Sequence, residues 1–97
     1  MNKLFLIIYD LKVPGRDYNS LYDAIKAIST DYQHPLDSTW FVFTDTDRSS
    51  QNIYDELRKT IDDNDNLFIV NMNNPLERQG WMPKNFWTWF AEKVNIL

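Results

Sequence analysis

Three short runs of apolar and aromatic residues constrain the fold of this chain more than any other feature of its sequence. They are KLFLIIY at 3–9, TWFVFTD at 39–45 and LFIVNM at 67–72. Their β-branched and aromatic residues, flanked by turn-forming residues, are typical of buried strands. Side chains alternate between the two faces of a strand, yet both alternating sets are largely apolar in these runs. Both faces of the resulting sheet are therefore expected to be covered.

Helical periodicity fills the intervals between these runs. Apolar residues recur every three or four positions over residues 18–28, which predicts a first helix. They recur every four positions from Ile53 to Ile61, which predicts a second helix. Ser49 or Ser50 is placed to cap the start of that second helix.

The stretch DYQHPLDSTWFVFTD predicts a β-hairpin. Residues 31–36 and 39–45 are its extended pieces, and Asp37 and Ser38 have the chemistry of the turn between them. Pro35 has no backbone N–H, which restricts the first piece to a sheet edge or a bulge. The order strand, helix, hairpin, helix, strand predicts a ferredoxin-like βαββαβ α+β sandwich with both helices on one face.

An aromatic segment follows the last strand run. Pro83 opens the sequence KNFWTWFAEKV, which we expect to form a short helix. The apolar residues of one face of this helix are Phe86, Trp87, Phe90 and Val94. We therefore expect the tail 81–97 to dock on the same domain. Trp89 is the tryptophan expected to remain exposed, where it could contact a protein partner.

The size and charge of the chain limit its class. Its 97 residues can form one hydrophobic core but not two, which predicts a single domain over 1–97. The chain has no cysteine, and its N-terminal apolar run is too short for a signal peptide or a membrane span. We therefore expect a cytoplasmic protein without a membrane partner. The net charge of −4 disfavours a wide nucleic-acid footprint, so any contact with nucleic acid is expected to be local.

A symmetric homodimer is the simplest way to cover the second face of the sheet. A contiguous apolar face on so small a protein is typical of a partner surface. Two copies packed sheet on sheet would each bury the same residues. We therefore expect a homodimer that buries the face containing part of the first strand.

Several segments resemble the CRISPR-associated protein 2 family. They are IIYDL at the end of the first strand, LDSTWFVFTD in the hairpin and DNLFIVNMN at the last strand, and the likeness covers nearly the whole chain. The SinR-like relatives share a tryptophan-bearing tail, and the virulence-associated protein D group is also similar. The resemblance implies a ferredoxin-like homodimer in which Asp10 lies near its symmetry mate. It implies that the protein is either a metal-dependent nuclease or a non-catalytic scaffold, since relatives of both kinds are described.

Asp10 is the sharpest candidate for catalysis and for metal binding. Two copies meeting across a two-fold axis would present hard oxygen ligands to Mg²⁺ or Mn²⁺, whose bound water could attack a phosphodiester. Lys12 and Arg16 follow in the next loop and could hold a phosphate. The alternative is that Asp10 caps the following turn by accepting backbone N–H bonds and that both basic residues are simply solvated.

Three further residues are accessory candidates. Tyr9 is expected to pack in the core or the dimer interface. His34 is the only histidine and could act as an acid or base, although a histidine beside a proline is more often a hydrogen-bonded structural group. Ser38 could donate to a phosphate, but a tight turn accounts for it equally well. The acidic stretch 62–66 lacks the glycine and the distal glutamate of a calcium loop and is expected to be a solvated helix end.

Three functions fit these residues. The first is a metal-dependent nuclease of RNA or DNA phosphodiester bonds that uses paired Asp10 carboxylates. The second is a non-catalytic dimeric scaffold or regulator that binds a protein in a defence or mobile-element system, and the third is a module that binds a small nucleotide. A single candidate carboxylate per chain argues against the nuclease. The position of Asp10 favours it, because a charge at the end of a buried strand requires compensation.

Overall fold

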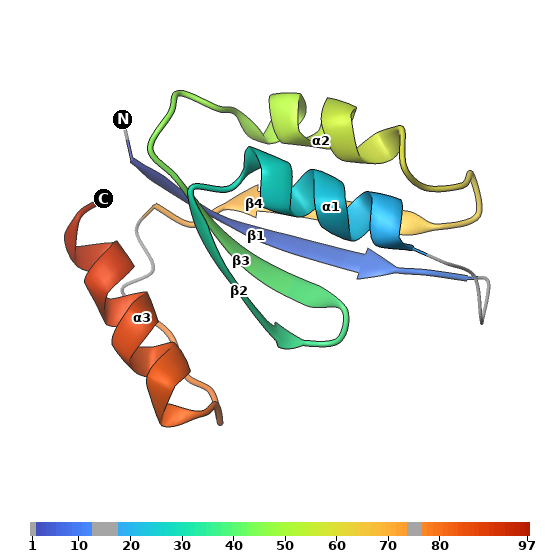
Figure 1. The fold of residues 1–97 in the computed structure, drawn as a ribbon. Helices are drawn as coiled ribbons and strands as arrows, with labels where there is room; N and C mark the ends of the chain where they lie inside the picture. The colour runs from blue at the N-terminus through green and yellow to red at the C-terminus, as the bar shows by residue number, and fades with distance from the viewer. Residues whose placement is uncertain (1, 13–17, 74–76) are drawn as a thin grey trace.

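The computed structural model describes residues 2–12, 18–73 and 77–97, and Figure 1 shows their arrangement. The elements are β1 (Lys3–Asp10), α1 (Asn19–Ile28), β2 (Asp31–Leu36), β3 (Thr39–Thr44), α2 (Ser50–Arg58), β4 (Asn66–Asn71) and α3 (Lys84–Asn95). None of these helices is long and apolar enough to cross a membrane.

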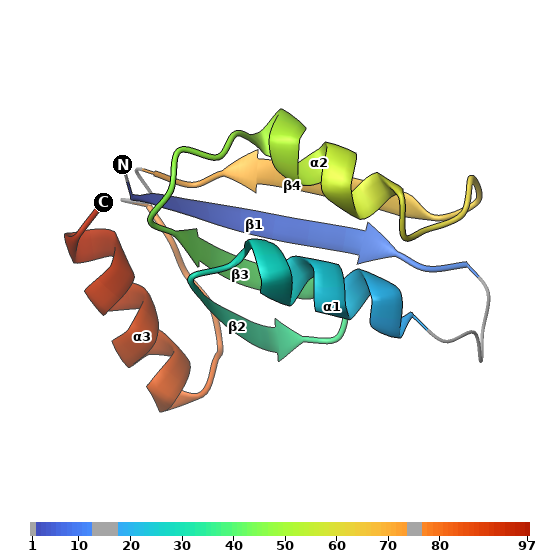
Figure 2. The same cartoon turned by 45° about the horizontal axis from the view of Figure 1, so that its top comes forward.

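The four strands form one antiparallel sheet in the order β2-β3-β1-β4. β1 is therefore a central strand, and β2 and β4 lie at the edges. α1 and α2 lie side by side on one face of the sheet (Figures 1 and 2). The result is a small α+β fold that is compatible with the ferredoxin-like arrangement expected from the order of the elements.

Local chemistry accounts for two boundaries that the sequence predicts. The Oγ atom of Ser49 accepts the backbone N–H of Asn52 at 3.0 Å, which caps the start of α2. The pairing of β2 with β3 shifts register between Gln33 and Leu36, the interval that contains Pro35. The bulge and the edge position of β2 both follow from the missing N–H of that proline.

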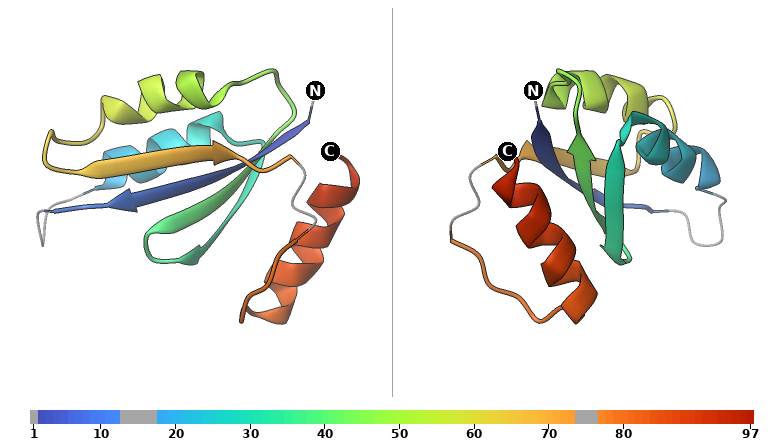
Figure 3. Two further views of the ribbon diagram at one scale, coloured as in Figure 1. Left: turned by 180° about the vertical axis from the view of Figure 1, so that it is seen from behind. Right: turned by 60° about the vertical axis from the view of Figure 1, so that its left-hand side comes forward.

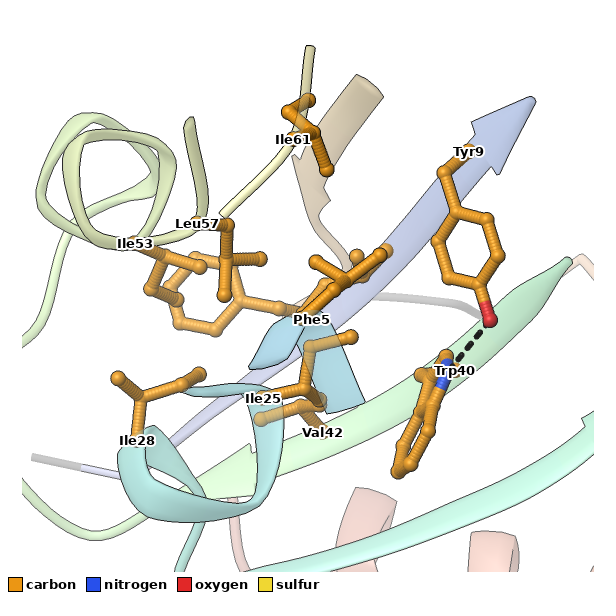
Figure 4. Packing of buried hydrophobic residues seen from close by; sticks show 11 residues of the cluster. Phe5, Tyr9, Ile25, Ile28, Trp40, Val42, Ile53, Leu57 and Ile61 are labelled. Atoms are coloured by element: carbon orange, nitrogen blue, oxygen red, sulfur yellow. Dashed lines mark hydrogen bonds between the residues drawn. The ribbon is translucent and has the colours of Figure 1, made fainter. Parts of the chain in front are cut away.

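The main core lies between the sheet and the first two helices (Figure 4). β1 contributes Phe5, Ile7 and Tyr9 to this core. The other residues buried with them are Leu21, Ile25, Ile28, Trp40, Val42, Ile53, Leu57 and Ile61. Ile61 was expected within the second helix, but α2 ends at Arg58 and Ile61 lies in the turn that follows. These residues are the periodic apolar positions of the sequence, so the burial of alternate strand residues under two helices is the main stabilising feature of the fold.

A second cluster forms on the opposite face, where α3 packs across one end of the sheet (Figure 3). Leu4 and Phe43 of the sheet contact Phe86, Trp89 and Phe90 of α3. Burial of each large side chain contributes on the order of 1.5 to 3 kcal/mol, so this contact is substantial.

The expectation that Trp89 is exposed is wrong. Its side chain is buried, and its Nε1 atom donates to Oδ2 of Asp31 at 3.1 Å. Lys93, one turn further along α3, places its Nζ atom 3.0 Å from the same oxygen. Phe86, Trp89 and Phe90 share one helical face because they lie three and four residues apart. The fully exposed tryptophan is Trp81, which precedes the helix.

The rest of this face carries apolar side chains beyond the α3 contact. Leu6 pairs with Val70 and Ile8 pairs with Phe68 in the register of β1 and β4. Phe68 is 62% exposed, and the other three residues are half-buried. We call Leu6, Ile8, Phe68 and Val70 the open patch. The sheet therefore has two apolar faces, of which α1 and α2 cover one and α3 covers one end of the other.

Candidate functional site

Asp10 ends β1 on the face of the open patch. Side chains alternate along a strand, so Asp10 follows Leu6 and Ile8 rather than Tyr9. Its backbone pairs with Asn66 at the start of β4. A shallow depression of about 170 Å³ runs beside it, lined by Ile8, Tyr9, Asp10, Asn66, Leu67 and Phe68. The carboxylate thus lies at the rim of the open patch.

The carboxylate of Asp10 is exposed and is paired with a lysine. Its side chain is 64% exposed, and Oδ2 lies 2.5 Å from Nζ of Lys12, whose own side chain is 43% exposed. Exposed ion pairs of this kind contribute on the order of 1 kcal/mol or less. Solvent and Lys12 both reach the carboxylate, so the charge of Asp10 is already compensated. Arg16, the other predicted phosphate ligand, lies outside the described residues.

Asp65, rather than Asp10, caps the turn that follows β1. Its side chain is buried, with only 7% exposed. One carboxylate oxygen accepts the backbone N–H of Lys12 at 2.9 Å and the hydroxyl of Tyr18 at 3.2 Å. The other oxygen accepts the backbone N–H of Asp62 at 3.0 Å. Asp65 therefore joins the chain after β1 to the turn before β4 and supports the position of Lys12.

The prediction of a solvated helix end at 62–66 is wrong for Asp65, although Asp62 and Asp63 are exposed. One feature of the sequence could have indicated the buried role of Asp65. This acid directly precedes β4 and its apolar run. An acid at that position, next to the end of a neighbouring strand, can accept the backbone N–H groups of the adjoining loop.

Tyr9 lies on the other face of β1, in a network with the hairpin. Its hydroxyl accepts the indole N–H of Trp40 at 3.0 Å, as Figure 4 shows, and donates to the carbonyl of Asp37 at 3.0 Å. Burial raises the pKa of Tyr9 to about 12. The hydroxyl therefore keeps its proton near neutral pH and is not a general base there.

His34 joins the same network from β2. Its ring stacks on Trp40 with ring centroids 3.9 Å apart and an angle of 14° between the planes. Its Nε2 atom lies 3.2 Å from the carbonyl oxygen of Asp37 and 3.4 Å from the hydroxyl of Tyr9. Ser38 lies in the turn of the hairpin, and its side chain is exposed. Its backbone carbonyl accepts the backbone N–H of Tyr9 at 3.0 Å.

The predicted site residues therefore form two groups rather than one. Asp10 and Lys12 lie at the rim of the open patch. Tyr9 and His34 meet Trp40 on the side of the sheet that α1 covers, where ring stacking and hydrogen bonds hold the end of the hairpin. The geometry gives the second group a structural role and leaves the first group as the candidate site.

Comparisons with known proteins identify the fold and nothing further. No protein-family model matches the chain, and no curated protein matches it. Among solved structures, the chain is similar to a hypothetical protein, TT1823, from Thermus thermophilus. The two share 21% sequence identity with a TM-score of 0.58, over 86% of this chain and 96% of that one. At this identity the likeness concerns the fold alone.

Proposed function

We propose that the chain forms a homodimer through the open patch, and that the dimer uses its two Asp10 carboxylates with Mg²⁺ or Mn²⁺ to hydrolyse phosphodiester bonds of RNA or DNA. One observation carries this proposal. Asp10 projects from the same face of β1 as Leu6 and Ile8, so covering the open patch with a second copy brings two Asp10 side chains to one interface.

The composition of the open patch supports the dimer. Its four residues are neighbours across the β1–β4 ladder, so they form one surface rather than scattered contacts. Phe68 exposes most of its ring to water. Contiguous apolar surfaces of this kind mark interaction sites, and a symmetric dimer covers both copies with one contact.

The donor set fits a shared divalent cation. Each chain offers the exposed oxygens of Asp10, and no group of three His, Asp or Glu side chains able to hold a metal occurs among the described residues. Mg²⁺ retains several waters and uses one or two protein carboxylates, so Asp10 supplies half of such a site. A bound ion would polarise the phosphate and lower the pKa of a coordinated water.

Lys12 has a role of its own beside this carboxylate. Its ammonium group contacts Asp10 and is partly exposed, so it can turn to a phosphate oxygen when the carboxylate is otherwise occupied. Arg16 is proposed as a second phosphate ligand. The overall charge of −4 confines the contact with a polyanion to this basic loop.

A non-catalytic dimeric scaffold or regulator that binds a protein or a small nucleotide is the second candidate. The observation that favours it is the Asp10–Lys12 ion pair, which neutralises the one candidate carboxylate in each chain. Tyr9 and His34 belong to the hairpin network, which leaves Asp10 without a neighbouring acid–base group among the predicted site residues.

A nuclease assay with matched variants tests the first proposal. Purified wild type, Asp10→Asn and Lys12→Ala are incubated with labelled single-stranded RNA and duplex DNA in the presence of Mg²⁺, Mn²⁺ or EDTA. Asp23→Asn is the control, since it removes an exposed acid from α1 on the helical side of the sheet. We expect cleavage that requires metal, is lost in Asp10→Asn and persists in Asp23→Asn.

Two results would contradict the nuclease. Cleavage that survives Asp10→Asn would assign the activity to another residue or to a contaminant. The absence of cleavage by wild type with either metal would leave the scaffold as the better proposal. Light scattering of wild type and Phe68→Asp tests the dimer independently, because a monomer has a mass of 11.6 kDa. Tyr32→Asp on β2 is the matched control, since Tyr32 is an exposed aromatic residue on the opposite edge of the sheet and pairs with Val42 of the helix-covered face.

A further inference from the structure

The two edges of the sheet differ in how they are protected. β2 contains Pro35 and a register shift, and both features hinder the addition of another strand. β4 has neither feature. Its sequence NLFIVN contains no proline and no charged residue, and its register with β1 is uninterrupted from Asn66 to Asn71. β4 therefore presents an unprotected edge, which Figure 2 shows beside α2.

The backbone of β4 faces this edge at alternate residues. The N–H of Met72 donates to the carbonyl of Leu4 at 2.7 Å, so the β4 residues bonded to β1 are those two, four and six positions before Met72. The intervening residues Leu67, Ile69 and Asn71 direct their N–H and C=O groups away from β1. Within the part of the chain that the structure describes, β4 pairs with no second strand. An added strand could therefore bond these three residues without disturbing the sheet.

A depression lies between β4 and α2. It is lined by Ser50, Gln51, Tyr54, Leu67, Phe68 and Ile69. Its volume is about 220 Å³, below the roughly 300 to 1,000 Å³ of small-molecule pockets. The depression therefore has the size for one large side chain rather than for a free ligand.

The segment that adjoins this edge is acidic. Residues 50–66, which run from α2 to the start of β4, contain five acidic and two basic residues. They account for three of the four net negative charges of the chain. Both bases are already paired, Arg58 with Asp63 and Lys59 with Glu56, so acids are in excess here. A partner with lysine or arginine would be attracted to this edge.

We propose that the edge of β4 binds an extended segment of another protein as a fifth strand. The segment carries a large apolar side chain for the depression and lysine or arginine around it. Backbone hydrogen bonds to Leu67, Ile69 and Asn71 supply affinity, and the depression and the acidic segment supply specificity.

A second copy of the chain matches this edge less well. Its own Leu67 and Ile69 are packed against its own core, so neither can enter the depression. Its acidic segment would also be brought against the same acidic segment of the first copy. The site uses the edge of the sheet rather than the open patch, so it requires neither the dimer nor the nuclease of the proposed function.

Peptide display tests the proposal. A phage-displayed library of random peptides long enough to span β4 is selected on the immobilised full chain. Asn71→Pro removes one outward N–H and places a ring in the path of an added strand, whereas Asn71→Ala keeps the N–H. Both variants lose the bond from the N–H of Asn73 to the Asn71 side chain, so they form a matched pair. Selected peptides should bind Asn71→Ala like wild type and Asn71→Pro at least about tenfold more weakly.

Tyr54→Ala tests the depression without altering the strand. Tyr54 is 40% exposed, so its removal should leave the circular dichroism of the protein unchanged. It should weaken peptide binding, whereas Tyr32→Ala on the opposite edge strand should not. The selected sequences should place an apolar residue among lysines or arginines, and their affinity should fall as the salt concentration rises.

Amide hydrogen exchange of the wild-type chain identifies the new bonds directly. When a selected peptide is added, the N–H groups of Leu67 and Ile69 should exchange more slowly. Those of Phe68 and Val70 are already bonded to β1 and should not change. This measurement uses no variant, so it decides the question even if Asn71→Pro fails to fold.

Three results would overturn the proposal. The first is a library that yields no binding peptide, or only peptides that bind Asn71→Pro as well as Asn71→Ala. The second is peptide binding that leaves the exchange of Leu67 and Ile69 unchanged. The third is slow exchange of these two amides that appears without peptide and increases with protein concentration, which would assign the edge to a second copy. A negative nuclease assay would overturn the proposed function and leave this site unaffected.

Discussion

Replacement of Tyr9 by phenylalanine should change stability by an amount that depends on pH. The hydroxyl accepts the indole N–H of Trp40 and donates to the carbonyl of Asp37, both at 3.0 Å, and the side chain is 5% exposed. A buried donor left without its acceptor destabilises a protein by about 1 to 3 kcal/mol. At pH 8 we therefore expect Tyr9→Phe to lower the free energy of unfolding by about 2 kcal/mol.

At alkaline pH the wild type should lose part of this advantage. Burial raises the pKa of Tyr9 to about 12 in the folded protein, whereas its ordinary value is 10.0. Between these values the unfolded chain releases a proton that the folded protein retains, so wild-type stability falls as the pH rises. Two pKa units correspond to roughly 3 kcal/mol, of which about half is lost by pH 11. The difference between wild type and Tyr9→Phe should then shrink to roughly 1 kcal/mol or less.

Urea unfolding followed by far-ultraviolet circular dichroism measures this difference at each pH from 8 to 11. Other titrating groups are common to both proteins and cancel in the subtraction. Tyr54→Phe is the control, because Tyr54 is 40% exposed and its variant should stay within a few tenths of a kcal/mol of wild type. A Tyr9 difference that stays constant across this pH range would refute the argument from burial.

Three further predictions concern polar contacts and the tail. Burial acts to raise the pKa of Asp31, but hydrogen bonds from Lys93 and Trp89 lower it overall below its ordinary value of 3.8. The contact is therefore intact above that pH and is lost as the pH falls below it, which near-ultraviolet circular dichroism should detect as loosening of α3. Asp65→Asn should lower the free energy of unfolding in urea by about 1 to 3 kcal/mol, because a charged acceptor for buried donors is lost. Truncation after Met82 should lower it by several kcal/mol, at about 1.5 to 3 for each ring, and a truncated chain that melts like the full one would contradict the packing of α3.

The periodic apolar residues were sufficient to predict the order of the elements. Pro35 marked the edge strand and its bulge because a missing N–H has the same effect in any fold. Ser49 marked the start of α2 because capping is a local interaction. These features depend on residues that are neighbours in the chain, so the sequence alone is enough to predict them.

The candidate site depends on residues distant in the chain, and there the sequence was less informative. Asp65 and Lys12 are 53 positions apart, so only the completed sheet shows that the carboxylate holds this loop. The indole N–H of the buried Trp89 donates to Asp31, which lies 58 positions away on β2. Tyr9 and Asp10 are adjacent in sequence, yet their side chains lie on opposite faces of β1. The two residues therefore belong to different sites, which becomes evident only when the sheet is known.

The central position of β1 has a consequence for synthesis on the ribosome. β1 leaves the exit tunnel before the other three strands of the sheet, but one of its two partners is β4, the last of them. One edge of an apolar strand therefore stays unpaired until β4 has been made. Unpaired apolar edges are where nascent chains associate wrongly. The sheet should consequently close late, and a stalled or shortened nascent chain that ends before β4 should aggregate rather than fold.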